Sequence, residues 1–405
     1  MALRIVASRP DPGIVTLPWT TPLEAWGEDV VVPLAQGISR HVVRIVRLGS
    51  RIYAVKETQE EIAFREYRTL RDLQRLSLPT VVPHAVVTGR VDRDGQELPA
   101  ALMTEHLPFS LPYRALFEHG LTADRLPTLV DALVVLLVRL HLADFYWGDV
   151  SLSNVLFRRD AGGFAAYLVD AETGELRATL SDRMREWDLQ IATENVYGEL
   201  LDLMASGAVA PDESPDDIIA LLHRRYAELW GELTETQEFA TDRMWELEQR
   251  IHRLNDLGFD VEELDIVTDY DRDTIQVCPR VVEAGHHQRE LRGLTGLDVE
   301  DEQARRILND IAAYTLSRDL GGLSREVVAQ RWMAEIYEPM VAMIPPEAHS
   351  KLEPAQMFHE ILEHRWFMSE RRGAYVKLLD AARDYFDSVI HQRPEEKAIT
   401  APPEI

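Results

Sequence analysis

Asp149 and Asn154 stand five residues apart in a short polar loop, between a long apolar helix pattern and an apolar strand pattern. A carboxylate in such a loop can orient a hydroxyl group and accept its proton, and an amide oxygen can help to hold magnesium. The spacing alone occurs often by chance. It gains meaning because residues suited to phosphate chemistry occur in a consistent order on both sides of it.

Lys56 ends a strand pattern well upstream of this loop, where its ammonium group could reach the phosphates of a nucleotide. The helix predicted after it carries Glu66 nearly three turns in, a depth suited to pairing with Lys56. Glu60 and Glu61 are alternatives to Glu66. Both belong to the first turn, where a capping box between Thr58 and Glu61 explains them.

Downstream of the loop, an apolar strand pattern ends at Asp170, sixteen residues beyond Asn154. This order of residues resembles that of protein-kinase-like enzymes, and the resemblance implies that the Asp170 carboxylate binds magnesium together with Asn154. Before the loop, Glu105 and Leu107 follow the last strand pattern of a small sheet, where the same resemblance implies a hinge between two lobes whose backbone is available to an adenine edge. Backbone amides or charge for the nucleotide phosphates are also expected from Gly37, Ser39 and Arg40.

Length and composition limit the class of protein. A chain of 405 residues with 46% hydrophobic and 28% charged residues suits two globular domains. The formal charge of −26 disfavours nucleic acid or an anionic membrane surface as a partner. No apolar run is long enough for an integral membrane segment, and the single Cys278 fits a reducing cytoplasm. We therefore predict a cytoplasmic protein.

The order of patterns predicts an α+β fold. A small antiparallel sheet with one helix is followed by a helical lobe, and these form a bilobal domain before a mainly α-helical C-terminal domain. Within the latter, a helix is expected from about 237 to 257, before one β-hairpin. The predicted parts are an irregular arm at 1–29, the bilobal domain at 30–205, the helical domain at 212–392 and a tail at 393–405.

The first half of the chain resembles the protein-kinase-like superfamily, and within it the lipopolysaccharide-kinase type. The whole chain resembles a bacterial group in which such a domain precedes a helical domain of unknown function, DUF4032. The segments that carry this resemblance are 37–41, 110–114, 147–149 and 363–366. It implies transfer of phosphate from Mg-ATP to a hydroxyl group. Lys56 and Glu66 would then position the phosphates, and Asp149 would be the base.

The sequence departs from the superfamily pattern in three places. Trp147-Gly148 replaces the usual His-Arg or His-Gly, Asp170-Ala171-Glu172 replaces Asp-Phe-Gly, and Gly37 is the one glycine of the phosphate loop. A pseudokinase that recruits a protein partner through its helical domain is therefore the alternative to an active enzyme. For an enzyme, the acceptor is unknown, with a sugar or a lipid-linked sugar favoured. A homo-oligomer is left open.

Three other patterns carry less weight. Residues 269–273 begin like a calcium loop, but Arg280 stands at the twelfth position in place of Glu, which favours an acidic turn. His359 and His364 are five residues apart on a predicted helix, so their imidazoles point to different faces. Asp188 could anchor the loop that contains Asp149 from a following helix, or it could simply be an acid in the N-terminal turn of that helix.

Overall fold

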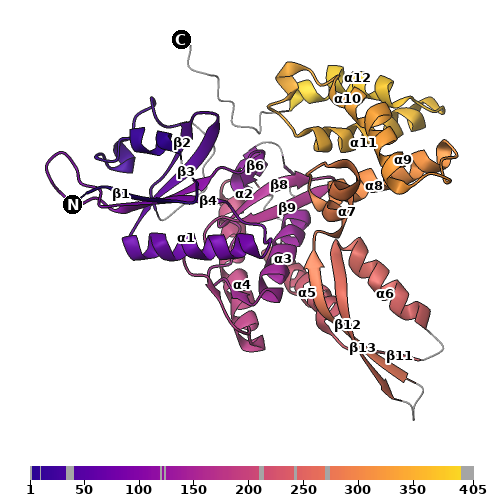
Figure 1. Ribbon diagram of the computed structural model, residues 1–405, viewed down its shortest axis with the longest axis horizontal. Helices are drawn as coiled ribbons and strands as arrows, with labels where there is room; N and C mark the ends of the chain where they lie inside the picture. The colour runs from indigo at the N-terminus through magenta and orange to yellow at the C-terminus, as the bar shows by residue number, and fades with distance from the viewer. Residues whose placement is uncertain are drawn as a thin grey trace. The chain divides into compact units, whose positions relative to one another are not determined.

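The computed structural model describes residues 2–9, 11–32, 41–118, 121–122, 125–208, 214–240, 244–269 and 274–393. The chain divides into two compact units, and Figure 1 shows its elements. The first unit is built mainly from Met1–Arg158 and Ala166–His223, and the second from Arg159–Ala165 and Arg224–Lys397. All the described candidate site residues lie in the first unit. The domain bounds predicted from the sequence stay predictions.

The first unit opens with a five-stranded antiparallel sheet in the order β1-β4-β5-β3-β2. Its strands are β1 (Arg4–Ala7), β2 (Val43–Leu48), β3 (Arg51–Thr58), β4 (Pro83–Thr88) and β5 (Ala100–Glu105). Helix α1 (Glu60–Arg75) lies along one face of this sheet (Figure 1). Because side chains alternate along a strand, Tyr53 and Val55 join the apolar cluster on the other face. Lys56 points toward α1.

The N-terminal segment differs from the irregular arm that the sequence predicted. Residues Arg4–Ala7 form β1 and pair with β4. Trp19 and Trp26 are buried in the cluster on the sheet face opposite α1. Strand β1 is too short to show a period of its own, and it is held by pairing with a distant strand. The predicted capping box is also wrong, because Thr58 ends β3 and Gln59 is the N-cap residue of α1.

Helices make up most of the rest of the first unit. They are α2 (Tyr113–Glu118), α3 (Leu126–Leu142), α4 (Asp182–Ala205) and the start of α5 (Pro215–Thr234). The short strands are β6 (Ser110–Pro112), β7 (Phe145–Tyr146), β8 (Val155–Asp160), β9 (Gly163–Leu168) and β10 (Glu175–Leu176), and the end of β8 and the start of β9 belong to the second unit. Helix α3 is apolar on nearly every side and largely buried. After α3, the chain passes through β7 into the loop that carries Asp149, and β8 follows this loop.

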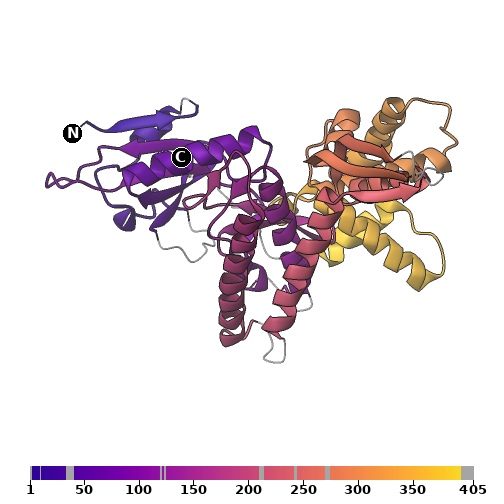
Figure 2. The ribbon, with the colours of Figure 1, turned by 90° about the horizontal axis from the view of Figure 1, so that it is seen from below.

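The second unit is mainly helical, with one small sheet. Its sheet has the order β11-β13-β12, from β11 (Gln237–Ala240), β12 (Phe259–Asp269) and β13 (Thr274–Ala284). Its helices are the end of α5, α6 (Met244–Asp256), α7 (His286–Thr295), α8 (Asp301–Ser317), α9 (Arg325–Trp332), α10 (Glu338–Val341), α11 (Pro354–Arg372) and α12 (Leu378–Ser388). A π-helical turn joins α9 to α10. Helices α11 and α12 pack against each other (Figure 2).

Trp332, Tyr337 and Phe358 form the aromatic centre of the second unit, with neighbouring ring centroids 5.5–5.7 Å apart. The predicted hairpin is present as β12 and β13. The helix predicted from about 237 is wrong at its start, because Gln237–Ala240 pair with β13 as a third strand. A short apolar run fits a strand as well as a helix end, and the distant partner strand decides between them.

The predicted α+β class is confirmed: a small antiparallel sheet with one helix, then a helical lobe, then a mainly helical C-terminal part. Among the described residues, no helix combines the length and the apolar character that crossing a bilayer requires.

Candidate active site

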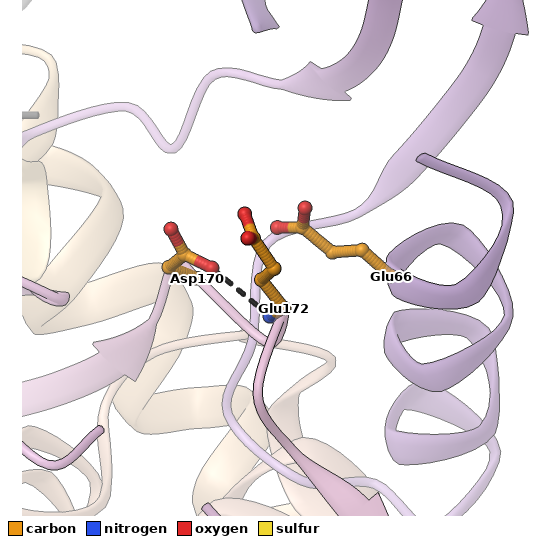
Figure 3. Close-up of side chains that lie close together, drawn as sticks. All are labelled: Glu66, Asp170 and Glu172. Carbon is orange, nitrogen blue, oxygen red and sulfur yellow. Dashed lines mark hydrogen bonds between the residues drawn. The ribbon is translucent and has the colours of Figure 1, made fainter. Parts of the chain in front are cut away.

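Lys56 lies at the centre of a cluster of three carboxylates. Its Nζ is 3.1 Å from Glu66 Oε2, 2.9 Å from Asp170 Oδ2 and 3.2 Å from Glu172 Oε2. Glu66 projects from α1, and the other two acids follow β9; Figure 3 shows the three carboxylates close together. The backbone N–H of Glu172 donates to Asp170 Oδ1 at 3.0 Å. One ammonium group is thus shared by three acids from two elements.

The electrostatics of this cluster follow from its burial. Burial lowers the pKa of Lys56, but the nearby carboxylates of Glu66 and Asp170 raise it more, so the ammonium form is held. Glu66 is 1% exposed, and burial raises its pKa to about 7 despite the opposing effect of Lys56. The charges of Asp170 and Glu172 contribute to this rise in the pKa of Glu66. The cluster therefore has more negative charge than Lys56 can neutralise.

A divalent cation is the natural complement of such an excess of carboxylate. In the part of the chain that the structure describes, Glu66, Asp170 and Glu172 are the acids whose ligand atoms lie close enough to share a metal ion, all within 4.8 Å of one another. His41 also reaches this cluster, with Nε2 2.8 Å from Glu172 Oε2. The sequence did not predict a role for Glu172.

Asp149 and Asn154 face each other across the loop between β7 and β8. The Asn154 side-chain amide donates to Asp149 Oδ2 and to the Asp149 carbonyl oxygen, each at 3.0 Å. With its NH2 group directed at Asp149, the oxygen of the Asn154 amide is the atom that could bind a cation. The loop continues into β8, and the N–H of Val169 donates to the Asn154 carbonyl at 3.1 Å. Asn154 therefore lies beside the chain segment that leads to Asp170.

Three polar side chains of helix α4 form hydrogen bonds with this loop, and two of them accept its backbone N–H groups. Asp188 is fully buried and accepts the backbone N–H groups of Trp147 at 2.8 Å and Gly148 at 2.7 Å. Glu199 accepts the N–H groups of Leu152 and Ser153, both at 2.8 Å.

Asn195 lies between these two anchors and donates to Asp149 Oδ1 at 3.2 Å. The spacings of seven and four residues place all three side chains on one face of α4. Sequence reasoning noted Asp188 alone. The spacing after it is the signal that could have found the other two.

Trp147 stands two residues before Asp149, and it is completely buried. Its indole Nε1–H donates to the Asp170 carbonyl oxygen at 3.3 Å. Its own carbonyl accepts the Thr173 hydroxyl at 2.8 Å. Gly148 follows with φ of +76°, and a Cβ there would lie 2.9 Å from the Tyr146 ring. Trp147 thus joins the loop to the end of the segment that carries Asp170.

The remaining predicted nucleotide contacts are only partly described. The N–H of Glu105 donates to the Val82 carbonyl at 2.8 Å, and that of His106 to the Ile52 carbonyl at 2.9 Å. The Leu107 carbonyl accepts the Ser110 hydroxyl at 2.7 Å. The adenine contacts predicted for Glu105 and Leu107 stay predictions. The other predicted phosphate contacts lie outside the described residues: Gly37, Ser39 and Arg40.

The alternatives raised by the sequence find little support. Glu60 and Glu61 are both exposed in the first turn of α1. His359 Nε2 lies 3.4 Å from Glu363, whereas His364 Nε2 lies 2.7 Å from Asp384, so the two imidazoles have separate partners. Residues 270–273 of the acidic turn lie outside the described residues.

A sheet with one covering helix, a Lys–Glu pair between them, and a loop bearing Asp and Asn before a second Asp define a protein-kinase-like domain. Residues 45–197 match the model of the lipopolysaccharide kinase (Kdo/WaaP) family, and residues 228–390 match the domain of unknown function DUF4032. The chain thus joins a domain of the lipopolysaccharide kinase family to a DUF4032 domain, and the resemblance drawn from the motifs is confirmed.

One similar solved structure is described as WaaP in complex with acyl carrier protein. It is 17% identical, and the match covers 56% of this chain and 99% of that chain with a TM-score of 0.31. No curated protein matches the sequence. The family match places the first domain in the class of kinase-like phosphotransferases.

Proposed function

We propose that the first unit transfers the γ-phosphate of Mg-ATP to a hydroxyl group, with a sugar or a lipid-linked sugar as the favoured acceptor. The observation that carries this proposal is the sharing of the Lys56 ammonium by Glu66, Asp170 and Glu172. This arrangement combines a phosphate-binding cation with surplus carboxylate ligands for a metal. The name of the matching family supports a sugar acceptor.

The residues present fit a magnesium ion. Asp170 offers carboxylate oxygens, and the amide oxygen of Asn154 is available because its NH2 group is used by Asp149. Hard oxygen ligands of this type are those that magnesium prefers. When bound, the ion would supply positive charge that neutralises the phosphate oxygens. Asp170 and Asn154 would hold it, with Glu172 as an additional carboxylate nearby.

Asp149 is the proposed base. Its carboxylate accepts the proton of the acceptor hydroxyl as the new bond from oxygen to the γ-phosphorus forms and the bond to the β-phosphate oxygen breaks. ADP leaves with the electrons of the broken bond. Lys56, held by Glu66, neutralises phosphate charge during transfer. Asn154 and Asn195 orient the base, and the buried Trp147 keeps its loop next to Asp170.

The test combines binding and turnover. Calorimetric titration with ATP should show binding that requires magnesium in the wild type and is lost in Asp170→Ala. The exposed acid Asp72, also in the first unit, provides the matched control variant Asp72→Ala. Asp149→Ala should bind Mg-ATP nearly as the wild type does, but its formation of ADP should fall by about 100-fold or more.

Two outcomes would contradict the proposal. Wild-type turnover by Asp149→Ala would remove this residue as the base. Absence of ATP binding by the wild type would favour the alternative, a pseudokinase that recruits a protein partner through its helical domain.

A further inference from the structure

Asp149 receives a second side-chain amide besides that of Asn154. Asn195 Nδ2 donates to Asp149 Oδ1 at 3.2 Å, whereas Asn154 Nδ2 donates to Asp149 Oδ2 at 3.0 Å. Each carboxylate oxygen therefore has its own neutral donor, one from within the loop and one from α4. Two such contacts fix the plane of the carboxylate.

Asn195 also makes a second hydrogen bond. Its Nδ2 donates to the Val150 carbonyl at 3.1 Å, so the same NH2 group spans the Asp149 side chain and the next peptide unit. The two hydrogen bonds orient the Asn195 amide and hold the Asp149 carboxylate next to the backbone of its own loop. An amide at this place carries no charge. A Lys or Arg would hold the charged carboxylate more strongly and make it a weaker proton acceptor.

The loop backbone has two other anchors on α4 besides the hydrogen bond from Asn195 to the Val150 carbonyl. Asp188 holds the amides of Trp147 and Gly148 on one side, and Glu199 holds those of Leu152 and Ser153 on the other. Asn195 lies between these anchors on the same face of α4. Its removal should therefore free the Asp149 side chain while the loop stays in place.

We propose that Asn195 is a positioning residue that orients the Asp149 carboxylate to accept the proton of the acceptor hydroxyl. This inference rests on the proposed function. A base must present a lone pair to the reacting hydroxyl in a narrow range of directions, and small displacements of a reacting group are costly in rate. The role of Asn195 is thus in the chemical step and not in the binding of the nucleotide.

The experiment compares Asn195→Leu and Asn195→Asp with wild type, using release of inorganic phosphate from Mg-ATP with water as the acceptor. Asn195→Leu keeps the size of the side chain and removes the donor. We expect its kcat to fall about tenfold, with the KM for ATP unchanged. The matched control is Glu194→Gln, an exposed neighbour on α4, which should retain wild-type kcat.

Asn195→Asp gives a second readout, because it keeps the shape of the side chain and replaces the donor by a carboxylate. That carboxylate cannot donate to Asp149 Oδ1 and repels it, so kcat should fall at least as far as in Asn195→Leu, with the KM for ATP unchanged. Hydrogen exchange at the Leu152 and Ser153 amides should stay as in wild type in both variants, because Glu199 still accepts them. A purely structural role would instead make this exchange faster.

The outcomes separate this inference from the proposed function. Wild-type kcat in both variants, or a loss of kcat accompanied by faster hydrogen exchange at the Leu152 and Ser153 amides, would overturn the role of Asn195 alone. A raised KM for ATP with unchanged kcat would also overturn it, because nucleotide binding would then be the affected step. If wild-type protein releases no more phosphate than Asp149→Ala, the proposed function fails and this inference fails with it.

Discussion

The two halves of the candidate site are stabilised in opposite ways. The half around Lys56 consists of charged groups, with three carboxylates around one ammonium group. The half around Asp149 consists of hydrogen bonds in which neutral amides and backbone N–H groups donate to carboxylates. The first has charge in excess, and the second has its donors and acceptors in balance.

This difference between the two halves predicts how substitutions in each of them change the stability of the protein. Buried acids without enough counter-charge cost free energy in the absence of a cation, and such strain is common at functional sites. A loop whose buried donors are satisfied contributes to folding and keeps its shape before substrate arrives. We therefore expect substitutions in the loop half to destabilise the protein. Removal of a carboxylate from the Lys56 half should be tolerated or even stabilising.

The largest effect on stability is expected for Asp188→Ala. Asp188 is fully buried and accepts the N–H groups of Trp147 and Gly148, with His141 Nε2 at 3.2 Å. Without it, one buried and one partly buried backbone donor lose their acceptor. The free energy of unfolding should fall by about 3–5 kcal/mol, measured by denaturant titration.

The exposed acid Glu186 on the same helix provides the control, and Glu186→Ala should stay within about 0.5 kcal/mol of wild type. If Asp188→Ala were as stable as this control, the loop half would not be the rigid part of the site.

A smaller effect of opposite sign is expected for Glu66→Gln. Burial raises the pKa of Glu66 from an ordinary 4.5 to about 7 in the folded protein. Between these values the folded state retains a proton that the unfolded state has released, so the free energy of unfolding falls as pH rises. Glutamine cannot ionise. The variant should therefore gain on the order of 2 kcal/mol relative to wild type between about pH 5 and about pH 8.

Urea titrations across this pH range would measure the gain. Glu61→Gln, an exposed position on the same helix, should show a pH dependence parallel to that of wild type. A parallel curve for Glu66→Gln as well would mean that Lys56 neutralises the cluster fully, and the contrast between the two halves would disappear.

The sequence predicted the Lys56 half of the site better than the loop half. Lys56 and Glu66 were found because a strand end and a helix depth follow local periods, and the structure brings them within 3.1 Å. Glu172 was missed because its neighbourhood depends on how the segment after β9 folds back toward α1. The pairing of β1 with β4 was missed for the same reason, since its partner lies far along the chain.

Helix α4 shows why the loop half was harder to predict. The buried face of this helix carries the charged residue Asp188. The apolar residues Trp187 and Leu201 of the same helix are instead 60% and 47% exposed to solvent. An apolar period therefore does not mark which side of this helix is inside. Asn195 and Glu199 look like ordinary surface residues in the sequence, because the groups they bind are backbone amides and a carboxylate from a loop more than forty residues earlier.

The smallest effect is expected for Glu199→Gln. This variant tests whether Glu199 holds the loop backbone while Asn195 orients the Asp149 carboxylate. Glu199 Oε2 accepts the N–H of Leu152, and Oε1 accepts that of Ser153. Glutamine keeps one acceptor oxygen and presents an NH2 group to the other amide. Stability should fall by about 1 kcal/mol, with faster hydrogen exchange at these two amides than in Glu194→Gln. Because Asn195 would still hold Asp149, kcat should fall less than in Asn195→Leu. A larger loss of kcat in Glu199→Gln would mean that the loop backbone, and not the Asn195 amide, sets the direction of the base.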